Sequence, residues 1–321
     1  MILLTGAAGF IGSCMAARLN ESGVRNLVLC DDFSRPDKVA NWQYKACAER
    51  VERDLLPEWL AQKGTQLQAV IHLGARTDTT ETQTALFETL NLKPSKLLWD
   101  FCTRQQIPFI YASSAATYGD GSQGFDDNHA DIQTLAPLNA YGDSKHQFDL
   151  WALAQTEAPP TWVGLKFFNV YGPNEYHKGR MASVIFHAFA QIRDRQQLRL
   201  FRSHRPDFAD GGQMRDFVYV KDVCEVILFA LERSLPSGIY NLGSGKARSF
   251  LDLGKAVFQA MQVPEQIEFI DTPADIRATY QYFTEANIDK LRNAGYSRPF
   301  VPLEEGISDY VQMYLKPGMY R

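Results

Sequence analysis

The sequence predicts an α/β fold: a doubly wound parallel sheet with a smaller C-terminal α/β lobe. Short apolar runs alternate with amphipathic stretches along the first half of the chain, which is typical of βαβ units. A glycine-rich turn follows the first apolar run and opens the first amphipathic stretch. The 321 residues, 45% of them apolar and 22% charged, have the composition of a globular protein that can bury a large core.

The expected elements follow in order along the chain. Five short apolar runs are expected to form strands: 2–5, 27–30, 69–73, 109–112 and 163–168. Helices are expected from about residue 10, up to about residue 104, and over 141–155. Beyond residue 168 the elements shorten, and loops rich in Gly, Asp and Pro intervene. We therefore divide the chain into a dinucleotide-binding lobe, 1–168, and a second lobe, 169–321, with the chain crossing between them.

Charge and cysteine content exclude several classes of partner. With 33 Lys and Arg against 37 Asp and Glu, the formal net charge is −4, so no global basic field is available for nucleic acid or an anionic membrane. The five cysteines lack CxxC spacing, and neither a disulfide framework nor a metal site is predicted. The first residues lack the basic and long apolar regions of a secretory signal, and we expect a cytoplasmic protein.

The first motif is Gly6-Ala-Ala-Gly-Phe-Ile-Gly12, between a predicted strand and a predicted helix. This is the context of a Rossmann dinucleotide motif. Gly6 permits a tight turn, Gly9 lets the backbone approach a pyrophosphate, and Gly12 allows helix and strand to pack closely. The helix N-terminus adds free N–H groups and the positive end of a dipole. The alternative is an ordinary strand-to-helix turn.

An acidic residue follows the motif at the expected spacing. Asp31 lies about 20 residues after Gly12, where a carboxylate binds the ribose hydroxyls of NAD. Arg35 and Lys38 follow in the same loop, and two cations there can instead neutralise the 2′-phosphate of NADP. They can also be ordinary solvated loop residues. The preference between NAD and NADP therefore stays open at this point.

The candidate catalytic groups are Ser114, Tyr141 and Lys145. Tyr141 and Lys145 are four residues apart, so on a helix they share one face. A tyrosine with a pKa of about 10 is a poor base, but an adjacent ammonium and an oxidised nicotinamide lower that value. Ser114 follows a predicted strand, at the edge where open α/β sheets bind ligands, and its hydroxyl can bind a substrate hydroxyl. The neighbouring Ser113 is expected to pack in the turn.

Together these residues resemble the extended short-chain dehydrogenase/reductases over the whole chain. Within that superfamily, three segments resemble the ADP-glyceromanno-heptose 6-epimerase family. They are Phe167-Phe-Asn-Val-Tyr-Gly-Pro-Asn-Glu-Tyr-His-Lys-Gly-Arg-Met-Ala-Ser-Val, Arg215-Asp-Phe-Val-Tyr-Val-Lys-Asp-Val and Tyr280-Gln-Tyr-Phe-Thr. The His-Lys-Gly stretch followed by Met-Ala-Ser is much more specific than the cofactor motif.

The resemblance implies a redox epimerisation at carbon six of ADP-D-glycero-D-manno-heptose, through a ketone, with a tightly bound NADP or NAD. Because hydride returns to the opposite face of the sugar carbon, proton transfer is needed on two sides. The resemblance assigns one side to Tyr141 and the other to Lys178, whose amine must be partly desolvated to act as a base. It also implies a homo-oligomer in a bacterium that makes the lipopolysaccharide inner core.

The same resemblance assigns the binding residues. Cofactor contacts are expected from the glycine turn and the ends of the following strands: Gly6, Gly9, Phe10, Ile11, Gly12, Asp31, Asp32, Lys38, Leu73, Gly74, Ala75, Asn91, Lys145 and Val170. Substrate contacts are expected from the catalytic serine and the second lobe: Ser114, Asn169, Arg180, His187, Phe201, Arg202, Ser203, Arg215 and Tyr280.

Some of these assignments have structural alternatives. Arg215 is the main pyrophosphate candidate. Arg180 replaces a small residue of the family, so it either adds a phosphate or sugar contact or changes which sugar fits. His187 can instead cap a helix or pack in the core, and Asn169 can tie a loop to the sheet. His204 is left unassigned, because it opens a Gly-Gly-containing loop whose length varies in the family.

Other functions remain as alternatives. A nucleotide-sugar dehydratase shares Ser114, Tyr141 and Lys145 by type, but it needs an acidic residue beside the serine, where this chain has Ala115 and Ala116. A UDP-hexose 4-epimerase has no need of the His-Lys-Gly stretch. A catalytically silent NADP sensor is typically without the active tyrosine or lysine.

Overall fold

The computed structural model describes residues 1–233, 235–277 and 280–321. Its main sheet has seven parallel strands in the order β10-β6-β5-β4-β1-β2-β3. These strands are β1 (Ile2–Thr5), β2 (Leu27–Asp31), β3 (Glu49–Glu52), β4 (Ala69–His72), β5 (Phe109–Ser114), β6 (Trp162–Phe167) and β10 (Gly238–Leu242). The predicted doubly wound parallel sheet is therefore confirmed.

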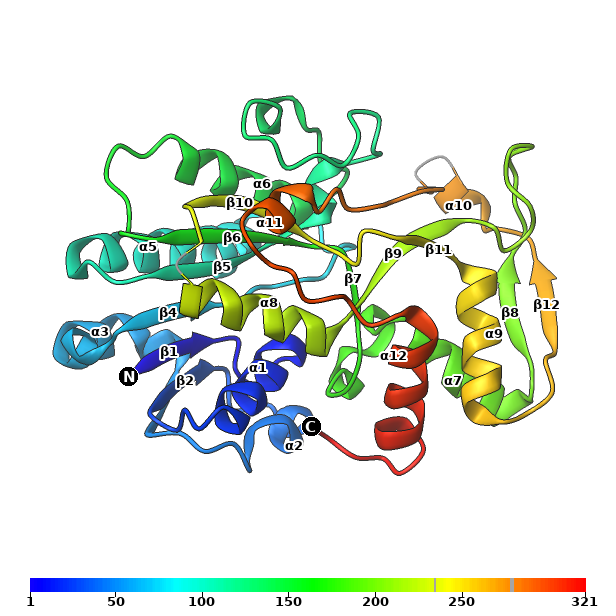
Figure 1. Cartoon of the computed structure of the whole chain (residues 1–321), viewed down its shortest axis with the longest axis horizontal. Helices are drawn as coiled ribbons and strands as arrows, with labels where there is room; N and C mark the ends of the chain where they lie inside the picture. The colour runs from blue at the N-terminus through cyan, green and yellow to red at the C-terminus, as the bar shows by residue number, and fades with distance from the viewer. Residues whose placement is uncertain (234, 278–279) are drawn as a thin grey trace.

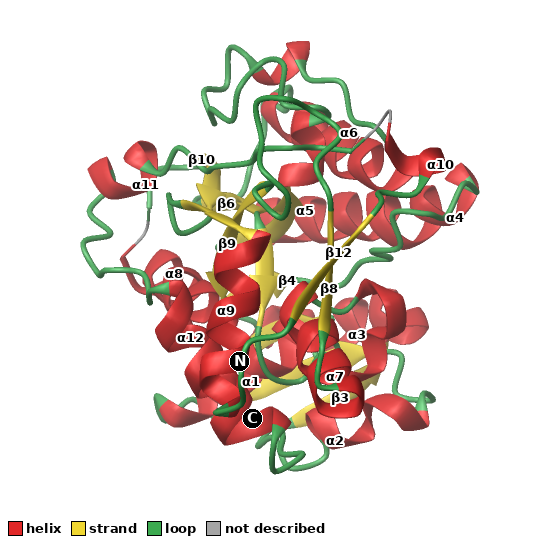
Figure 2. Ribbon diagram, turned by 90° about the vertical axis from the view of Figure 1, so that its right-hand side faces the viewer, coloured by secondary structure: helices red, strands yellow, loops and turns green. Residues whose placement is uncertain are grey.

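Helices cover both faces of this sheet (Figure 2). One face packs on α1 (Phe10–Glu21) and α8 (Val220–Arg233), and the other on α3 (Leu56–Lys63), α5 (Lys93–Gln105) and α6 (Ala140–Leu153). Successive strand residues point to opposite faces, so that Leu3 lies in one apolar cluster and Leu4 in the other. Both faces are buried, which explains why these strands are continuous apolar runs. The short helix α2 (Val39–Trp42) lies in the loop after β2, whereas α4 (Thr84–Phe87) continues into α5 through a π-helical turn, Glu88–Leu92.

The second lobe contains two small sheets (Figure 1). One has β7 (Asn169–Tyr171), β9 (Met214–Tyr219) and β11 (Ala247–Ser249), and the other pairs β8 (Leu198–Phe201) with β12 (Ile267–Ile270). Its helices are α7 (Val184–Arg195), α9 (Phe250–Met261), α10 (Ala274–Arg277), α11 (Asp289–Asn293) and α12 (Leu303–Tyr310). Strand β10 comes after residue 168 but belongs to the main sheet, and α8 packs on that sheet, so the chain crosses between the lobes.

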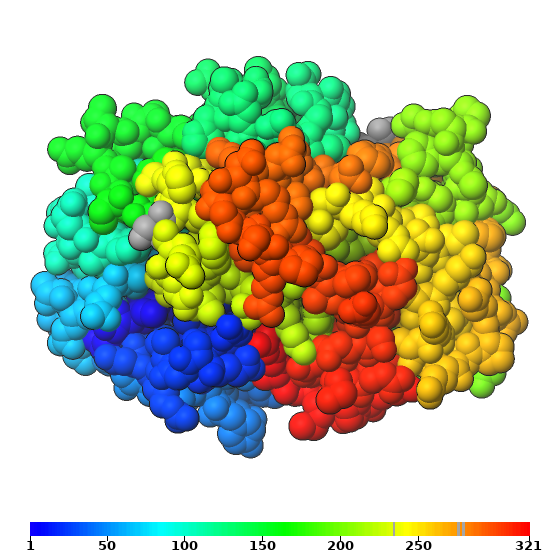
Figure 3. Space-filling view, in the orientation of Figure 1, coloured from blue at the N-terminus to red at the C-terminus, as the bar shows by residue number. Residues whose placement is uncertain are grey.

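The C-terminal segment returns to the first lobe. In Figure 3 the red C-terminal surface lies against the blue N-terminal surface. The Arg321 guanidinium lies 2.7 Å from the carboxylate of Glu21, at the end of α1, and the Arg321 carbonyl oxygen accepts from the Lys45 ammonium. Among the residues that the structure describes, no helix is long and apolar enough to cross a membrane.

The five strands expected from the apolar runs are confirmed. Strand β10 was not predicted, and neither was β3. Its sequence Glu-Arg-Val-Glu buries only Val51, because it forms the edge of the sheet beside β2. The strand order reverses between β1 and β4. In open α/β sheets such a switch point is where the loops at the carboxyl ends diverge and a ligand binds. The glycine turn after β1 and the Leu73-Gly74 turn after β4 meet there.

Candidate active site

The glycine turn is shaped by two close backbone contacts. Gly6 has a φ of +69°, and a Cβ on it would lie 2.7 Å from the backbone of Leu73 and Gly74. A Cβ on Gly12 would lie 2.0 Å from the Gly6 carbonyl oxygen. Helix α1 then begins at Phe10 with no side-chain cap at Gly9, so its first N–H groups remain available to an anion. The turn therefore has the shape and charge that a dinucleotide pyrophosphate requires.

Replacing Gly12 with alanine is expected to remove most of the bound cofactor. The added methyl group overpacks the turn, which costs about 1–3 kcal/mol, or about tenfold or more in affinity. The measurement is the nicotinamide nucleotide released by acid from the purified protein. Gly23→Ala is the control: Gly23 lies beyond the other end of α1, and although the substitution strains a positive φ of +87°, no atom lies within 4 Å of the added Cβ. Full cofactor content in Gly12→Ala would contradict the assignment of this turn.

Asp31 is the last residue of β2, and both of its carboxylate oxygens accept hydrogen bonds. It accepts from the Ala8 N–H at 2.9 Å, the Asp32 N–H at 2.7 Å and the Lys38 ammonium at 3.1 Å. The other loop cation, Arg35, pairs instead with Asp37, with its Nε 3.1 Å from the carboxylate. Of the two cations that the sequence offered, only Lys38 therefore lies beside Asp31. The Asp32 carboxylate accepts from the Ser34 hydroxyl, which lowers its pKa.

The turn after β4 is tied to the neighbouring elements. The Gly74 N–H donates to the Thr5 hydroxyl at 3.1 Å. Asn91 is buried and fixes the segment that follows Ala75: its side chain exchanges two hydrogen bonds with the Arg76 backbone and donates to Ser144 at 2.9 Å. In the protein alone the Asn91 amide thus holds this loop against α6. Val170 lies in β7, half-buried.

Helix α6 brings Tyr141 to the end of β5. Its N-cap Asn139 accepts from the Gly142 N–H at 2.8 Å, and the helix packs on the turn that follows Ser114. Burial raises the pKa of Tyr141, and the neighbouring Ser114 hydroxyl offsets part of that rise. The Ser114 hydroxyl oxygen itself accepts from the Ala116 N–H at 3.1 Å.

Lys145 lies one helical turn after Tyr141 and is buried. Its ammonium donates to the Ala112 carbonyl oxygen at 2.8 Å. Burial lowers the pKa of Lys145 to about 8, and the Asp149 carboxylate opposes this effect. The expected lowering of the Tyr141 pKa concerns this ammonium together with an oxidised nicotinamide. In the protein alone the Tyr141 pKa is raised, because burial of the phenol dominates and Lys145 is bound to the β5 backbone.

Lys178 lies in the 3-10 helix Tyr176–Met181. Its Nζ is 5.2 Å from the centroid of the Phe10 ring, at the start of α1 beside the glycine turn. Burial lowers the pKa of Lys178, and Glu175 opposes this. The preceding His177 contacts Asn41 at 3.2 Å, and burial, reinforced by Lys38, lowers its pKa to about 4. The partial desolvation that a basic lysine needs is therefore present.

Arg180 extends from the same 3-10 helix toward the segment after β4. Its guanidinium lies 3.3 Å from the Asp78 carboxylate and also contacts the Thr80 hydroxyl, although 67% of the side chain is exposed. His187, on α7, has its Nε2 3.4 Å from the Arg180 carbonyl oxygen. These two residues thus border the Lys178 segment.

A half-buried arginine and several aromatic rings form a cluster in the second lobe. The Arg215 guanidinium lies 5.7 Å from the centroid of the Tyr280 ring and donates to the Gln281 carbonyl oxygen at 2.5 Å. The rings of Phe201 and Tyr280 are 6.0 Å apart. Burial lowers the pKa of Arg215. This combination of a desolvated cation and flat rings suits a nucleoside diphosphate.

Sequence reasoning missed two members of this cluster. The Nδ1 of His204 lies 2.8 Å from the Tyr282 hydroxyl, and the His204 ring is 6.5 Å from that of Tyr280. The two tyrosines are separated by one residue, and this alternation was the available signal. Their ring centroids are 5.6 Å apart.

Other expected substrate contacts have protein partners in this structure. Arg202 lies 3.3 Å from Asp271, and the Ser203 hydroxyl donates to the Arg205 carbonyl oxygen. The Asn169 amide donates to the Asp216 carbonyl oxygen at 3.3 Å and ties β7 to β9. Three more arginines of the basic run are neutralised by nearby acids, in the pairs Arg193–Asp194, Arg199–Glu268 and Arg205–Asp207.

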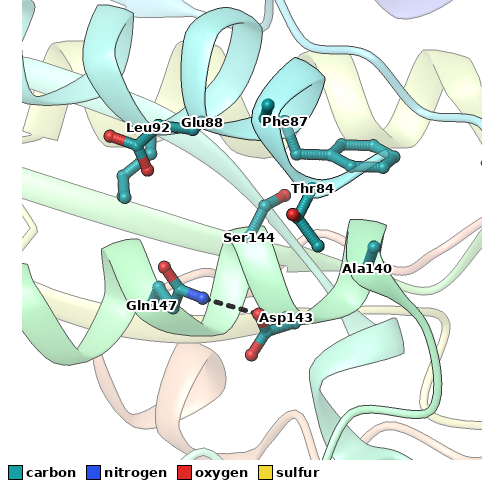
Figure 4. Close-up of a pocket in the computed structure, with 9 residues that line it drawn as sticks. Thr84, Phe87, Glu88, Leu92, Ala140, Asp143, Ser144 and Gln147 are labelled. Carbon is teal, nitrogen blue, oxygen red and sulfur yellow. Dashed lines mark hydrogen bonds between the residues drawn. The ribbon is translucent and has the colours of Figure 1, made fainter. Parts of the chain in front are cut away.

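A separate pocket lies between α4 and α6 (Figure 4). Ser144 and Gln147 line it from α6, and Thr84 and Phe87 from the facing segment. None of the expected catalytic side chains lines this pocket. It borders Tyr141 at two points: the Phe87 ring lies 6.5 Å from the ring of Tyr141, and the Ser144 hydroxyl donates to the Tyr141 carbonyl oxygen at 2.7 Å.

Comparison with known proteins agrees with this geometry. The model of the "NAD dependent epimerase/dehydratase family" matches residues 2–243. An ADP-L-glycero-D-manno-heptose-6-epimerase of Fusobacterium nucleatum subsp. nucleatum is 47% identical, and one of Nitratidesulfovibrio vulgaris strain DP4 is 48% identical, each over 98% of both chains. The crystal structure of the Helicobacter pylori ADP-L-glycero-D-manno-heptose-6-epimerase superposes with a TM-score of 0.82 at 28% identity, covering 97% of this chain and 95% of that one. The chain therefore belongs to the NAD dependent epimerase/dehydratase family and, within it, to the ADP-L-glycero-D-manno-heptose-6-epimerases.

Proposed function

We propose that this chain inverts carbon six of ADP-D-glycero-D-manno-heptose and so forms the L-glycero isomer. The observation on which this rests is the place of Lys178, a half-buried amine against Phe10 beside the glycine turn, in a chain that also has Ser114, Tyr141 and Lys145. An unactivated secondary carbinol has no acidic C–H. A second proton-transfer group is needed only if hydride leaves one face and returns to the other.

The cofactor is a nicotinamide dinucleotide of the NAD(P) type, and the residues fit it. The pyrophosphate would be held by the Gly6–Gly12 turn, whose space a Cβ would fill, and by the free N–H groups of α1. Asp31 and Lys38 would bind the adenosine ribose, and Lys145 the nicotinamide ribose. A bound nicotinamide supplies reversible hydride transfer, which makes carbon six a ketone that can be reduced on its other face.

The protein residues would manage the protons and the substrate. Because burial raises the pKa of Tyr141, its phenol stays protonated at neutral pH and donates to the oxygen of the ketone. Because burial lowers the pKa of Lys178, its neutral amine is more available to accept the hydroxyl proton on the other side. Ser114 would hold the reacting oxygen, and Arg215 the pyrophosphate of ADP.

One assay tests this function against its alternatives. The protein is incubated with ADP-D-glycero-D-manno-heptose without added nicotinamide, and carbon six is followed by proton NMR. Interconversion of the two epimers is expected. A deoxy product would indicate a dehydratase, and activity on a UDP-hexose alone would indicate a 4-epimerase. Bound cofactor without turnover of any sugar nucleotide would indicate a sensor.

We further propose that the cofactor is NADP, because Lys38 lies at the ribose-binding carboxylate. Replacing Lys38 with alanine is expected to lower the ratio of bound NADP to NAD by about tenfold or more, since a hydrogen bond to a charged group contributes about 1.5–3 kcal/mol. Mass spectrometry of the released nucleotide measures the ratio. Arg35→Ala is the control, because Asp37 already neutralises this exposed arginine, and its effect should be small. An unchanged ratio in Lys38→Ala would contradict the assignment.

The homo-oligomer and the cytoplasmic setting that the resemblance implies stay predictions. So does the effect of Arg180, which we propose tunes sugar selectivity through its contact with Asp78.

A further inference from the structure

A fully buried ion pair lies beneath the candidate catalytic residues. The Lys166 ammonium, on β6, is 2.7 Å from the Asp149 carboxylate, on α6, and neither side chain has any exposed surface. Removing two charges from water is expensive, and the mutual attraction repays this only when further hydrogen bonds satisfy both groups. The proposed reaction steps make no use of this pair. The presence of this buried ion pair therefore needs another physical reason.

The Asp149 carboxylate is bound by strand β5. The Ser113 hydroxyl donates to Oδ2 at 2.7 Å, and the Tyr111 hydroxyl donates to Oδ1 at 3.0 Å. Both donors lie on the strand that ends at Ser114. The pair thus connects α6, which contains Tyr141 and Lys145, to the strand that contains the catalytic serine.

The Lys166 ammonium reaches the turn after Ser114. It donates to the Thr117 hydroxyl at 2.6 Å, and that hydroxyl donates to the Ser114 carbonyl oxygen at 2.8 Å. The ammonium also lies 5.3 Å from the centroid of the Tyr118 ring. One buried cation therefore fixes the backbone on which the serine hydroxyl depends.

Asp149 also lies one helical turn after Lys145, whose ammonium is held by the Ala112 carbonyl oxygen. The titratable groups around Lys145 lie on two elements. Asp149 and Tyr141 lie on its own helix, and His72 lies on β4, where burial, reinforced by Lys145, lowers its pKa to about 3. Asp149 is therefore the anionic group among these neighbours that favours the charged form of Lys145.

We infer that Asp149 and Lys166 are positioning residues for the proposed epimerisation. They fix the positions of Ser114, Tyr141 and Lys145 relative to one another and keep Lys145 protonated. The inference rests on the proposed function for its kinetic consequence. Neither residue is assigned a contact with substrate or cofactor. Both act through the three residues that they hold.

The test compares Asp149→Asn, Lys166→Met, Lys166→Arg and the double variant Asp149→Asn/Lys166→Met. In Asp149→Asn we expect kcat to fall by up to about 100-fold with KM for ADP-heptose unchanged. The loss of the carboxylate destabilises the Lys145 ammonium, so the alkaline limb of the kcat profile moves to lower pH. Lys166→Met leaves the Asp149 carboxylate without its nearest cation. This carboxylate then stabilises the Lys145 ammonium more strongly, and the alkaline limb of the kcat profile moves to higher pH.

The other variants distinguish the effect of the buried charges from the effect of side-chain packing. The double variant removes both charges and should return the limb toward its wild-type position, even if Lys166→Met alone does not fold. Lys166→Arg keeps the charge and should retain most of kcat. The control is Asp222→Asn, a buried carboxylate on α8 that accepts from the Val301 N–H at 2.8 Å. It should lower the melting temperature without moving the pH profile.

The outcome is distinguishable from failure of the proposed function. If the wild-type chain does not epimerise ADP-heptose, the function fails. The positioning inference is then decided by lysine-selective ¹³C NMR, in which Asp149→Asn must lower the pKa of the Lys145 amine, assigned with Lys145→Met. If the wild type is active but Asp149→Asn keeps its kcat and pH profile, or changes only as Asp222→Asn does, the positioning inference is overturned.

Discussion

Replacing Lys178 with methionine is expected to abolish epimerisation while leaving cofactor and ADP-heptose binding close to wild type. Methionine is an apolar side chain of similar length, but it removes the amine, which lies 5.2 Å from the centroid of the Phe10 ring and accepts or donates a proton on one side of the sugar. The loss of a positioned general acid or base typically costs about 10²–10⁴-fold in rate. Proton NMR at carbon six measures turnover, and calorimetry measures binding.

The control for this variant is Lys63→Met, at the end of α3, where the lysine only pairs with Glu49. It should retain full turnover. Near-normal turnover of Lys178→Met would contradict the use of two proton-transfer groups, and parallel loss of binding would assign Lys178 to substrate recognition instead.

The second large effect is expected for Tyr141→Phe. The ring keeps its contact with Phe87, but the hydroxyl is lost, and turnover should fall by about 10²–10⁴-fold. Burial raises the pKa of Tyr141, so in the wild type the phenol is protonated at neutral pH and its proton is lost only at alkaline pH. Tyr141→Phe should therefore lose the alkaline limb contributed by this phenol as well as its rate.

The two variants should differ in the half-reaction that they retain. With each epimer supplied separately, absorbance at the wavelength of the reduced nicotinamide reports hydride transfer to the bound cofactor. At alkaline pH, where the Tyr141 phenol can lose its proton and act as the acceptor, Lys178→Met should still reduce the cofactor with one epimer, and Tyr141→Phe should do so with the other. The same preference in both variants would show that the two groups do not serve opposite faces.

The sequence predicted the cofactor end of the molecule well. The strands, the glycine turn and Asp31 at the end of β2 depend on local patterns, because a buried parallel strand reads as a continuous apolar run and a close backbone approach admits only glycine. The family resemblance was confirmed by relatives that match almost the whole chain.

Other features could not be predicted from the sequence. The sequence offered Arg35 and Lys38 equally, but only the fold places Lys38 against Asp31 and Arg35 against Asp37. It gave no partner for Arg180, which pairs with Asp78 across 102 residues of sequence separation. Nor could it give the direction of the Tyr141 pKa shift in the protein alone, which is upward, because desolvation depends on what surrounds the phenol rather than on its neighbours in sequence.

By itself, the sequence determined the sheet, the turn that suits a dinucleotide and the chemical types present at the site, because spacing, apolar periodicity and the lack of a Cβ act over a few residues. Only the tertiary structure decided which charges are paired, which are buried and which elements share a hydrogen-bond network. The Asp149–Lys166 pair illustrates the difference. Its energy depends on distance and on exclusion of water, and both arise when α6 and β6 pack together.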